Sequence, residues 1–252
     1  MNFIPCEKCK NTDSRLPEGY YWADKEKTMA TECECHYKWR IEEQGRKLFK
    51  HYGFNEKYWS YNPRSYVGTK SVNDKNRLLN YIVQFKENPD VRKLLVYMYG
   101  PNGTQKTSLA NYVGRRLILD GFDIRYVLMN NLVNSLQDME FHEDLKKKIE
   151  RLNDADLLIV DEAFDKEKMT LYKSGYQKSF LDSWMRDRIQ SKNKGILFIS
   201  NVKPENIADQ GLSVSIQDFV QRECIINKTL LTFEDSYIAE SHIEFDSSKG
   251  LF

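Results

Sequence analysis

The sequence predicts an α/β fold, in which a parallel sheet with helices on both faces carries a phosphate-binding loop. From about residue 93, short apolar runs alternate with amphipathic, helix-like stretches, which is the pattern of such a sheet. The apolar run Leu94–Tyr99 leads directly into a glycine-containing loop at 100–108. A later run, Leu157–Val160, leads directly into two acids, Asp161 and Glu162. Because ligands of open α/β sheets bind at the carboxyl ends of the strands, we expect a nucleotide site there.

The individual elements follow from the spacing of apolar residues. Short apolar runs predict strands at 93–99, 124–129, 157–160, 195–200 and 230–233. Helical spacing predicts helices at 107–119, 131–152 and 177–190, and Gly121 is a stop signal for the first of them. Upstream, an apolar face predicts a further helix near 75–87 that packs on this body, through Leu78, Leu79, Tyr81, Ile82 and Phe85.

Composition excludes several classes of protein. The 252 residues are 40% hydrophobic and 30% charged, which is enough apolar material for a substantial core. Lys and Arg number 38 against 37 Asp and Glu, so no overall positive field indicates nucleic-acid binding, and any DNA contact is a local patch. The first residues lack the pattern of a secretion signal, and no apolar stretch approaches the ~18 residues of a membrane span. We therefore expect a cytoplasmic protein without a membrane partner.

The loop at 100–108 departs from the usual G-x-x-x-x-G-K-[ST] pattern, because Gln105 replaces the second glycine. We expect the phosphates of ATP to be surrounded by Gly100, Pro101, Asn102, Gly103, Thr104, Gln105, Lys106, Thr107 and Ser108. In this pattern Lys106 reaches the β and γ phosphates, and the Thr107 hydroxyl binds Mg²⁺. The Gln105 side chain either narrows the pocket or supplies a new amide contact. We expect ATP to bind, and its hydrolysis to be slow or to depend on a partner.

Two further strand ends supply side chains for hydrolysis. Asp161 is predicted to hold Mg²⁺ through water, and Glu162 to polarise the water that attacks the γ phosphate. The run Ile196–Ser200 ends at Asn201, whose amide is expected to contact the γ phosphate or that water. Taken singly, an acid pair or an asparagine after a strand is also typical of an ordinary turn. Three such ends in one sheet favour a catalytic nucleotide site.

Four of the five cysteines lie within the first 35 residues, as the pairs Cys6-x-x-Cys9 and Cys33-x-Cys35. Two close pairs of thiolates are the ligand set of a structural, tetrahedral Zn²⁺ site, in which no position is left open for a substrate. His36 is a substitute ligand, and four free thiols in a polar tail are the alternative interpretation. Cys224 stands apart and is expected to be an ordinary buried thiol.

The order of phosphate loop, Asp-Glu strand and strand ending in Asn201 resembles the AAA+ ATPases. The resemblance implies a five-stranded parallel sheet of order 5-1-4-3-2, self-association, and hydrolysis at subunit interfaces that an arginine from the neighbour completes. The segment Gln217-Asp-Phe-Val-Gln-Arg222 resembles the one that carries this arginine, so Arg222 is the first candidate, with Arg186 and Arg188 as alternatives. An ordinary surface arginine is the other interpretation of Arg222. The residues after Arg222 are too few for the helical lid of most AAA+ proteins, so we expect none.

Most of the chain resembles one AAA+ group, the bacterial and phage replicative helicase loaders of the DnaC/DnaI type. The resemblance is carried by the early cysteine pairs, the segment Gly53-Phe-Asn-Glu-Lys-Tyr-Trp59 with Tyr61, the helix near 75–87, and Asp154-Ala-Asp156 before the Asp-Glu strand. It implies a zinc-binding, helicase-interaction domain at 1–50, a linker and helix at 51–90, and an AAA+ ATPase domain at 91–252. Such a protein would use ATP to load a replicative hexameric helicase onto single-stranded DNA during replication initiation.

Basic and aromatic residues give candidates for contact with single-stranded DNA, namely Lys146–Lys148 and the segment 164–176 with Lys166, Lys168, Tyr172, Lys173 and Tyr176. A lysine run on a helix is also typical of a solvated face. Two other functions stay open. One is a transposition ATPase resembling the IstB group, which would bind double-stranded DNA and a transposase. The other is a nucleotide-gated adaptor with little turnover, which Gln105 would explain.

Overall fold

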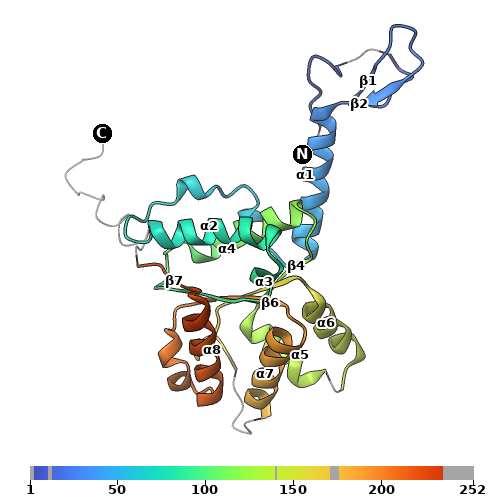
Figure 1. Ribbon diagram of the computed structural model, residues 1–252. Helices are drawn as coiled ribbons and strands as arrows, with labels where there is room; N and C mark the ends of the chain where they lie inside the picture. Colours follow the sequence, from blue (N-terminus) through green and yellow to red (C-terminus); the bar gives the residue numbers. More distant parts are fainter. Residues whose placement is uncertain (1–2, 11–12, 140, 171–175, 235–252) are drawn as a thin grey trace, which may run out of the picture.

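A five-stranded parallel sheet lies between two layers of helices, and a small N-terminal module extends from this body on a long helix (Figure 1). The computed structural model describes residues 3–10, 13–139, 141–170 and 176–234. The strands are β3 (Leu95–Tyr99), β4 (Ile124–Leu128), β5 (Leu157–Asp161), β6 (Gly195–Ser200) and β7 (Leu230–Thr232), in the spatial order β4-β5-β6-β3-β7. If these five strands are renumbered 1 to 5 along the chain, so that β3 is strand 1 and β7 is strand 5, the order read from β7 is 5-1-4-3-2. The predicted topology is therefore confirmed.

Side chains of the strands alternate between two cores, because successive residues of a strand point to opposite faces. In β3, Leu95 and Tyr97 belong to one core, and Val96 and Met98 belong to the other. The first core is covered by α5 (Met129–Asp138), α6 (Glu143–Asp154), α7 (Tyr176–Arg186) and α8 (Val214–Asn227). The second is covered by α1 (Glu34–His51), α2 (Val72–Glu87) and α4 (Lys106–Leu119), on the opposite face of the sheet (Figure 1).

Most predicted elements are found at or near the expected residues, and two helices differ. The helix predicted at 131–152 is two helices, α5 and α6, because the chain turns after Asp138, whose carbonyl accepts a hydrogen bond from the Phe141 N–H. The helix predicted at 177–190 ends in a π-helical turn, Asp187–Ser191. The predicted upstream helix is α2, and four of the five apolar residues that predicted it are buried, all but Leu79.

The remaining elements connect these layers. A short helix, α3 (Pro89–Arg92), leads from α2 into β3, and 3-10 turns lie at Glu56–Tyr58, Pro63–Ser65, Pro204–Asn206 and Ala208–Gln210. Within the described residues, which end at Glu234, no helical lid follows β7. None of the helices in the described part of the chain combines the length and the apolar character that crossing a membrane requires.

The helix α1 was not predicted, and it connects the N-terminal module to the sheet domain (Figure 1). The module consists of the described residues up to Cys35, at the start of α1, and contains an antiparallel hairpin of β1 (Tyr20–Trp22) and β2 (Ala30–Glu32). Along α1 only Gly45 and Phe49 are buried, so its apolar face is too narrow to give a clear periodic signal. Two glycines allow α1 and the residues after it to approach α4 closely. A Cβ on Gly45 of α1 would lie 2.5 Å from Leu119 of α4, and a Cβ on Gly114 of α4 would lie 2.4 Å from the Phe54 ring.

This close approach predicts that Gly114→Val destabilises the protein. The added side chain overlaps the buried Phe54 ring, and overpacking of this kind costs roughly 1–3 kcal/mol. Urea unfolding followed by far-UV circular dichroism measures the loss. The control is Arg116→Ala on the exposed face of the same helix, which should change the free energy of unfolding by less than about 0.5 kcal/mol. Equal stability of Gly114→Val and the parent protein would contradict the packing of Phe54 on α4.

Candidate nucleotide site and metal centre

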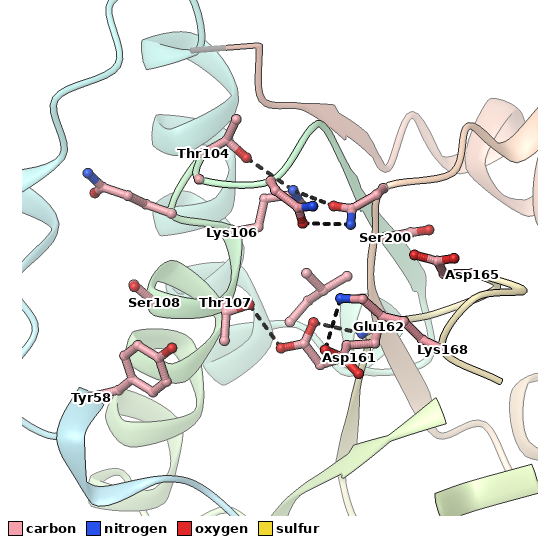
Figure 2. Close-up of a pocket in the computed structure, with 15 residues that line it drawn as sticks. Tyr58, Thr104, Lys106, Thr107, Ser108, Asp161, Glu162, Asp165, Lys168 and Ser200 are labelled. Carbon is pink, nitrogen blue, oxygen red and sulfur yellow. Dashed lines mark hydrogen bonds and ion pairs between the residues drawn. The ribbon is translucent and has the colours of Figure 1, made fainter. Parts of the chain in front are cut away.

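A cavity of about 330 Å³ opens at the carboxyl edge of the sheet, where the loops after β3, β5 and β6 meet (Figure 2). It is lined by Tyr58, Asn102, Gly103, Thr104, Gln105, Lys106, Thr107, Ser108, Asp161, Glu162, Asp165, Lys168, Ile199, Ser200 and Asn201. Most of the residues predicted to bind nucleotide are among them. Gly100 and Pro101 lie just behind the cavity and support it through their carbonyls, which accept hydrogen bonds from the Lys106 ammonium.

Lys106 lies inside the loop, at the first residue of α4. Its Nζ donates to the carbonyls of Gly100 and Pro101 at 2.6 and 2.7 Å, and to the Asn201 side-chain oxygen at 3.2 Å. Burial lowers the pKa of Lys106 to about 8. A phosphate bound at the amino end of α4 would favour the charged ammonium, because opposite charges raise the pKa of an amine.

Gln105 adopts the left-handed backbone conformation, with φ of 62° and ψ of 15°, directly before α4. This explains why the usual pattern has glycine here, since a non-glycine residue pays about 1–2 kcal/mol for that conformation. The side-chain oxygen of Gln105 accepts a hydrogen bond from the Tyr61 hydroxyl at 2.9 Å. The Gln105 side chain thus lines the cavity and is held by Tyr61 of the same chain.

Asp161 is the centre of a hydrogen-bond network at the end of β5. Its Oδ2 accepts from the Thr107 hydroxyl at 2.9 Å and from the Tyr126 hydroxyl at 2.6 Å, and its Oδ1 accepts from the Glu162 N–H at 2.7 Å. Burial and the Asp161 charge raise the pKa of Tyr126 far above its usual range, so its hydroxyl remains a donor. A carboxylate and a hydroxyl in contact are the oxygen ligands that Mg²⁺ takes beside nucleotide phosphates, so these residues fit the ion.

Glu162 and Asn201 complete the cavity. Glu162 lies in the left-handed region at φ of 55°, a strained conformation of the kind that clusters at functional sites. Its Oε1 forms an ion pair with Lys168 Nζ at 2.9 Å. The Asn201 amide donates to the Asn102 side chain at 2.8 Å. The three strand ends therefore meet at one site, as predicted, with Glu162 engaged by a lysine.

The three candidate arginines occupy different environments. Arg222 is exposed on α8 and does not line the cavity. Arg186 pairs with Asp182 at 2.8 Å and also contacts Ser215. Arg188 is wrong as an alternative, because it is fully buried and its guanidinium donates to four backbone carbonyls, those of Leu152, Asn153, Ala155 and Gly195. A side chain in that position cannot reach a neighbouring subunit.

The residues suggested for DNA contact are mostly solvated. Lys146, Lys147 and Lys148 lie on α6, where Lys147 pairs with Glu143 at 3.9 Å and Lys148 donates to Ser135. Lys166 is exposed, whereas Lys168 points to Glu162. Tyr172, Lys173 and the side chain of Tyr176 lie outside the described residues.

The four early cysteines come together in the N-terminal module. Their sulfurs lie within 4.8 Å of one another, with separations of 3.7 Å for Cys6 and Cys9, 3.6 Å for Cys6 and Cys33, and 3.3 Å for Cys9 and Cys35. A tetrahedral zinc site with Zn–S bonds of ~2.3 Å has sulfur–sulfur edges of about 3.8 Å. The backbone N–H of Cys9, and after it the neighbouring thiols and the Lys8 N–H, stabilise the Cys6 thiolate and lower the pKa of Cys6 to about 6. The residues therefore fit Zn²⁺.

His36 and Cys224, the other two residues considered in the sequence, are not part of this cluster. His36 Nδ1 lies 2.8 Å from Glu32 Oε1, and the cysteine cluster is complete without it. Cys224 is buried in the core, as predicted, and burial raises the pKa of its thiol to about 12.

Sequence reasoning missed Tyr126, Asp165 and Ser200, and it assigned Lys168 to DNA. A signal for Tyr126 was present, because the predicted strand order makes β4 the neighbour of β5. The register pairs Leu128 with Asp161, which puts Tyr126, two residues earlier, on the same face as Leu128. No local pattern indicated Lys168, because its contact depends on the turn that follows β5.

Comparisons with known proteins agree with this geometry. A family model described as IstB-like ATP binding protein matches residues 80–171. A solved structure of the DnaC helicase loader aligns with a TM-score of 0.53 and 19% identity, over 71% of this chain and 99% of that chain. AMPPCP-bound DnaA from Aquifex aeolicus aligns with a TM-score of 0.52 and 17% identity, over 74% of this chain and 56% of that chain. No curated protein matches the sequence.

A third solved structure is similar in fold. A primosome component from Streptococcus pyogenes serotype M3, described as putative, aligns with a TM-score of 0.50 and 12% identity, over 75% of this chain and 94% of that chain. The chain spans just over half of the DnaA chain. Together the matches show a P-loop, AAA+-like fold, and residues 80–171 are similar to the IstB-like ATP-binding family, which supports an ATPase.

The sulfur geometry predicts that Cys9→Ser abolishes zinc binding by the module. A structural Zn²⁺ site needs its full ligand set, so the zinc content should fall from about one ion per chain to near zero. Elemental analysis of the dialysed protein measures this. Cys224→Ala is the matched control and should retain the ion. A Cys9→Ser protein with full zinc content would contradict the four-cysteine site.

The Gln105 conformation predicts that Gln105→Gly changes ATP affinity by less than about threefold, or under 1 kcal/mol. The glutamine already has the backbone angles of the glycine it replaces, and its amide contacts Tyr61. Isothermal titration with a slowly hydrolysed ATP analogue measures the change, with Tyr61→Phe testing the hydrogen bond alone. A tenfold gain in affinity would mean that the glutamine obstructs the phosphates.

Proposed function

We propose that this protein is an ATP-dependent loader that places a replicative hexameric helicase on single-stranded DNA during replication initiation. The observation that carries the proposal is an AAA+ nucleotide site on a core that aligns with nearly the whole DnaC helicase loader, joined by α1 to a separate four-cysteine module. In this proposal the core binds and hydrolyses ATP with Mg²⁺, and the module binds the helicase. Such a protein would act in the cytoplasm.

The exposed side chains of the module support a role in protein binding. Ile4 is 84% exposed, Met29 58% and Tyr37 51%, and all three lie in or next to the module. Large apolar side chains left in solvent are available for contact with a protein partner. The helix α1 holds the module away from the sheet domain that carries the nucleotide cavity, so both can be occupied at once.

In the proposed mechanism Glu162 polarises the attacking water, and Asn201 contacts the γ phosphate or that water. The phosphates lie on the loop at 100–108, with Thr107 and Asp161 holding Mg²⁺. Arg222 supplies the transition-state charge to the site of a neighbouring subunit, since it is exposed on α8 and remote from its own cavity. Hydrolysis by an isolated chain is therefore slow, because that charge is missing.

DNA contact in this proposal comes from the exposed lysines on the side of α6 and from the segment 164–176 after Glu162. Lys146 and Lys166 are solvent-exposed and available to a phosphate backbone. Because the chain carries almost no net charge, this binding would be local and sensitive to salt.

One observation favours a second candidate function, a transposition ATPase. The matching family model is IstB-like and covers the nucleotide loop and the Asp-Glu strand. In that case the partners would be a transposase and double-stranded DNA. The cysteine module favours the loader.

The proposal predicts ATP-dependent capture of a hexameric helicase. The tagged protein is incubated with lysate of its native cells with and without ATP, and the retained protein is identified and then tested in purified form. Lys106→Ala should lose ATP binding by at least about tenfold and with it the ATP-dependent capture. Glu162→Gln should keep ATP binding and lose hydrolysis by about a hundredfold or more.

Four outcomes test the proposal and its alternative. Direct binding of a purified hexameric helicase, stronger with ATP, supports the loader. Recovery of a transposase together with a preference for double-stranded DNA would replace it by the transposition ATPase. Full hydrolysis by Glu162→Gln would overturn the assignment of Glu162, and rapid hydrolysis by the isolated parent chain would contradict the dependence on a neighbour.

A further inference from the structure

Lys168 occupies an unusual position, because it lines the nucleotide cavity and neutralises the acid assigned to catalysis. Its Nζ lies 2.9 Å from Glu162 Oε1, and the two side chains are 35% and 40% exposed. Figure 2 shows Lys168 and Asp165 on one side of the cavity, across from Thr107 and Ser108 on the other. A ligand that fills the cavity would therefore pass close to this ion pair.

The backbone on both sides of Lys168 is anchored by packing and hydrogen bonds, whereas its side chain is partly exposed. Ala163 and Phe164 are fully buried, and the Ala163 N–H donates to the Ile199 carbonyl at 2.9 Å. On the other side, Met169 is buried, and a turn is closed by the Lys168 N–H donating to the Asp165 carbonyl at 3.0 Å. The ammonium can therefore change partner by rotation about side-chain bonds alone, which takes no rearrangement of the fold.

The charged side chains that line the cavity do not balance. Three acids, Asp161, Glu162 and Asp165, face two lysines. Lys106 donates to carbonyl and amide oxygens, so Lys168 is the lysine that neutralises a lining carboxylate. ATP adds a γ phosphate that ADP lacks, and this multiply charged group competes with the single charge of Glu162 for the ammonium.

We propose that Lys168 is the residue that distinguishes ATP from ADP at this site. Its ammonium pairs with Glu162 in the nucleotide-free protein and moves to the γ phosphate when ATP binds. The transfer releases the Glu162 carboxylate, which is then free to orient water. This inference rests on the ATP site of the proposed function, and it assigns Lys168 to nucleotide selection instead of DNA contact.

The test compares the affinities of Mg²⁺-ATPγS and Mg²⁺-ADP by isothermal titration. In Lys168→Ala the preference for ATPγS over ADP should fall by about tenfold or more, because the variant loses one charge-assisted hydrogen bond to the γ phosphate. The affinity for ADP should stay within about twofold of that of the parent protein. Lys168→Arg should keep most of the preference. Lys70→Ala removes a lysine that is exposed and outside the cavity lining, so it is the matched control and should match the parent protein.

A double-mutant cycle tests the exchange of partners itself. Glu162→Gln removes the competing carboxylate, so it should raise ATPγS affinity more when Lys168 is present than in the Lys168→Ala background. Equal gains in the two backgrounds, or an unchanged ATPγS preference in Lys168→Ala, would overturn the inference. Circular dichroism melting of each variant separates a loss of fold from a loss of contact.

The failure of this inference is distinguishable from that of the proposed function. If the parent protein and Lys106→Ala both fail to bind ATPγS and ADP, the ATP site itself is wrong. If the parent protein binds both nucleotides and Lys168→Ala keeps its preference, the site stands and only the role of Lys168 is refuted.

Discussion

The parallel pairing of β6 with both β3 and β5 brings the functional groups of this protein to one place. Tyr99 pairs with Ser200, and Val160 pairs with Phe198, so the residues that follow all three strands leave the sheet at the same edge. The phosphate loop, Asp161 with Glu162, and Asn201 are far apart in the chain and meet only through this register. A shift in the β3–β6 pairing would separate Lys106 from Asn201, because their 3.2 Å contact spans this pair of strands.

The helices α1 and α4 connect the N-terminal cysteine module to the nucleotide cavity. The amino end of α4 faces the cavity, and further along the same helix Gly114 and Leu119 lie against Phe54 and Gly45, next to and within α1. The helix α1 then continues to Cys35, one of the four residues that fit a zinc ion. The metal centre and the nucleotide site are thus separate in space and connected through α1 and α4.

Much of the fold could be predicted because its signals are local. The buried strands β5 and β6 are continuous apolar runs, and α2 and α4 have wide apolar faces. The helix α1 was not predictable in this way, because its contact with α4 relies on a glycine and a single buried phenylalanine. The split between α5 and α6 was missed for a similar reason, since a turn within a polar stretch leaves little trace in the periodicity.

By itself the sequence determined which chemical groups are available: the phosphate loop, the acid pair, Asn201, the four cysteines and the order of the strands that carry them. These are properties of spacing along the chain, because each loop, acid pair and cysteine pair lies within a few consecutive residues. Tertiary structure alone decided how the groups are paired. It buried Arg188 among backbone carbonyls, joined Tyr126 to Asp161, turned Gln105 toward Tyr61, and held Lys168 against Glu162. Each of these contacts depends on the position and direction of side chains from separate segments, which the packing of the whole domain fixes.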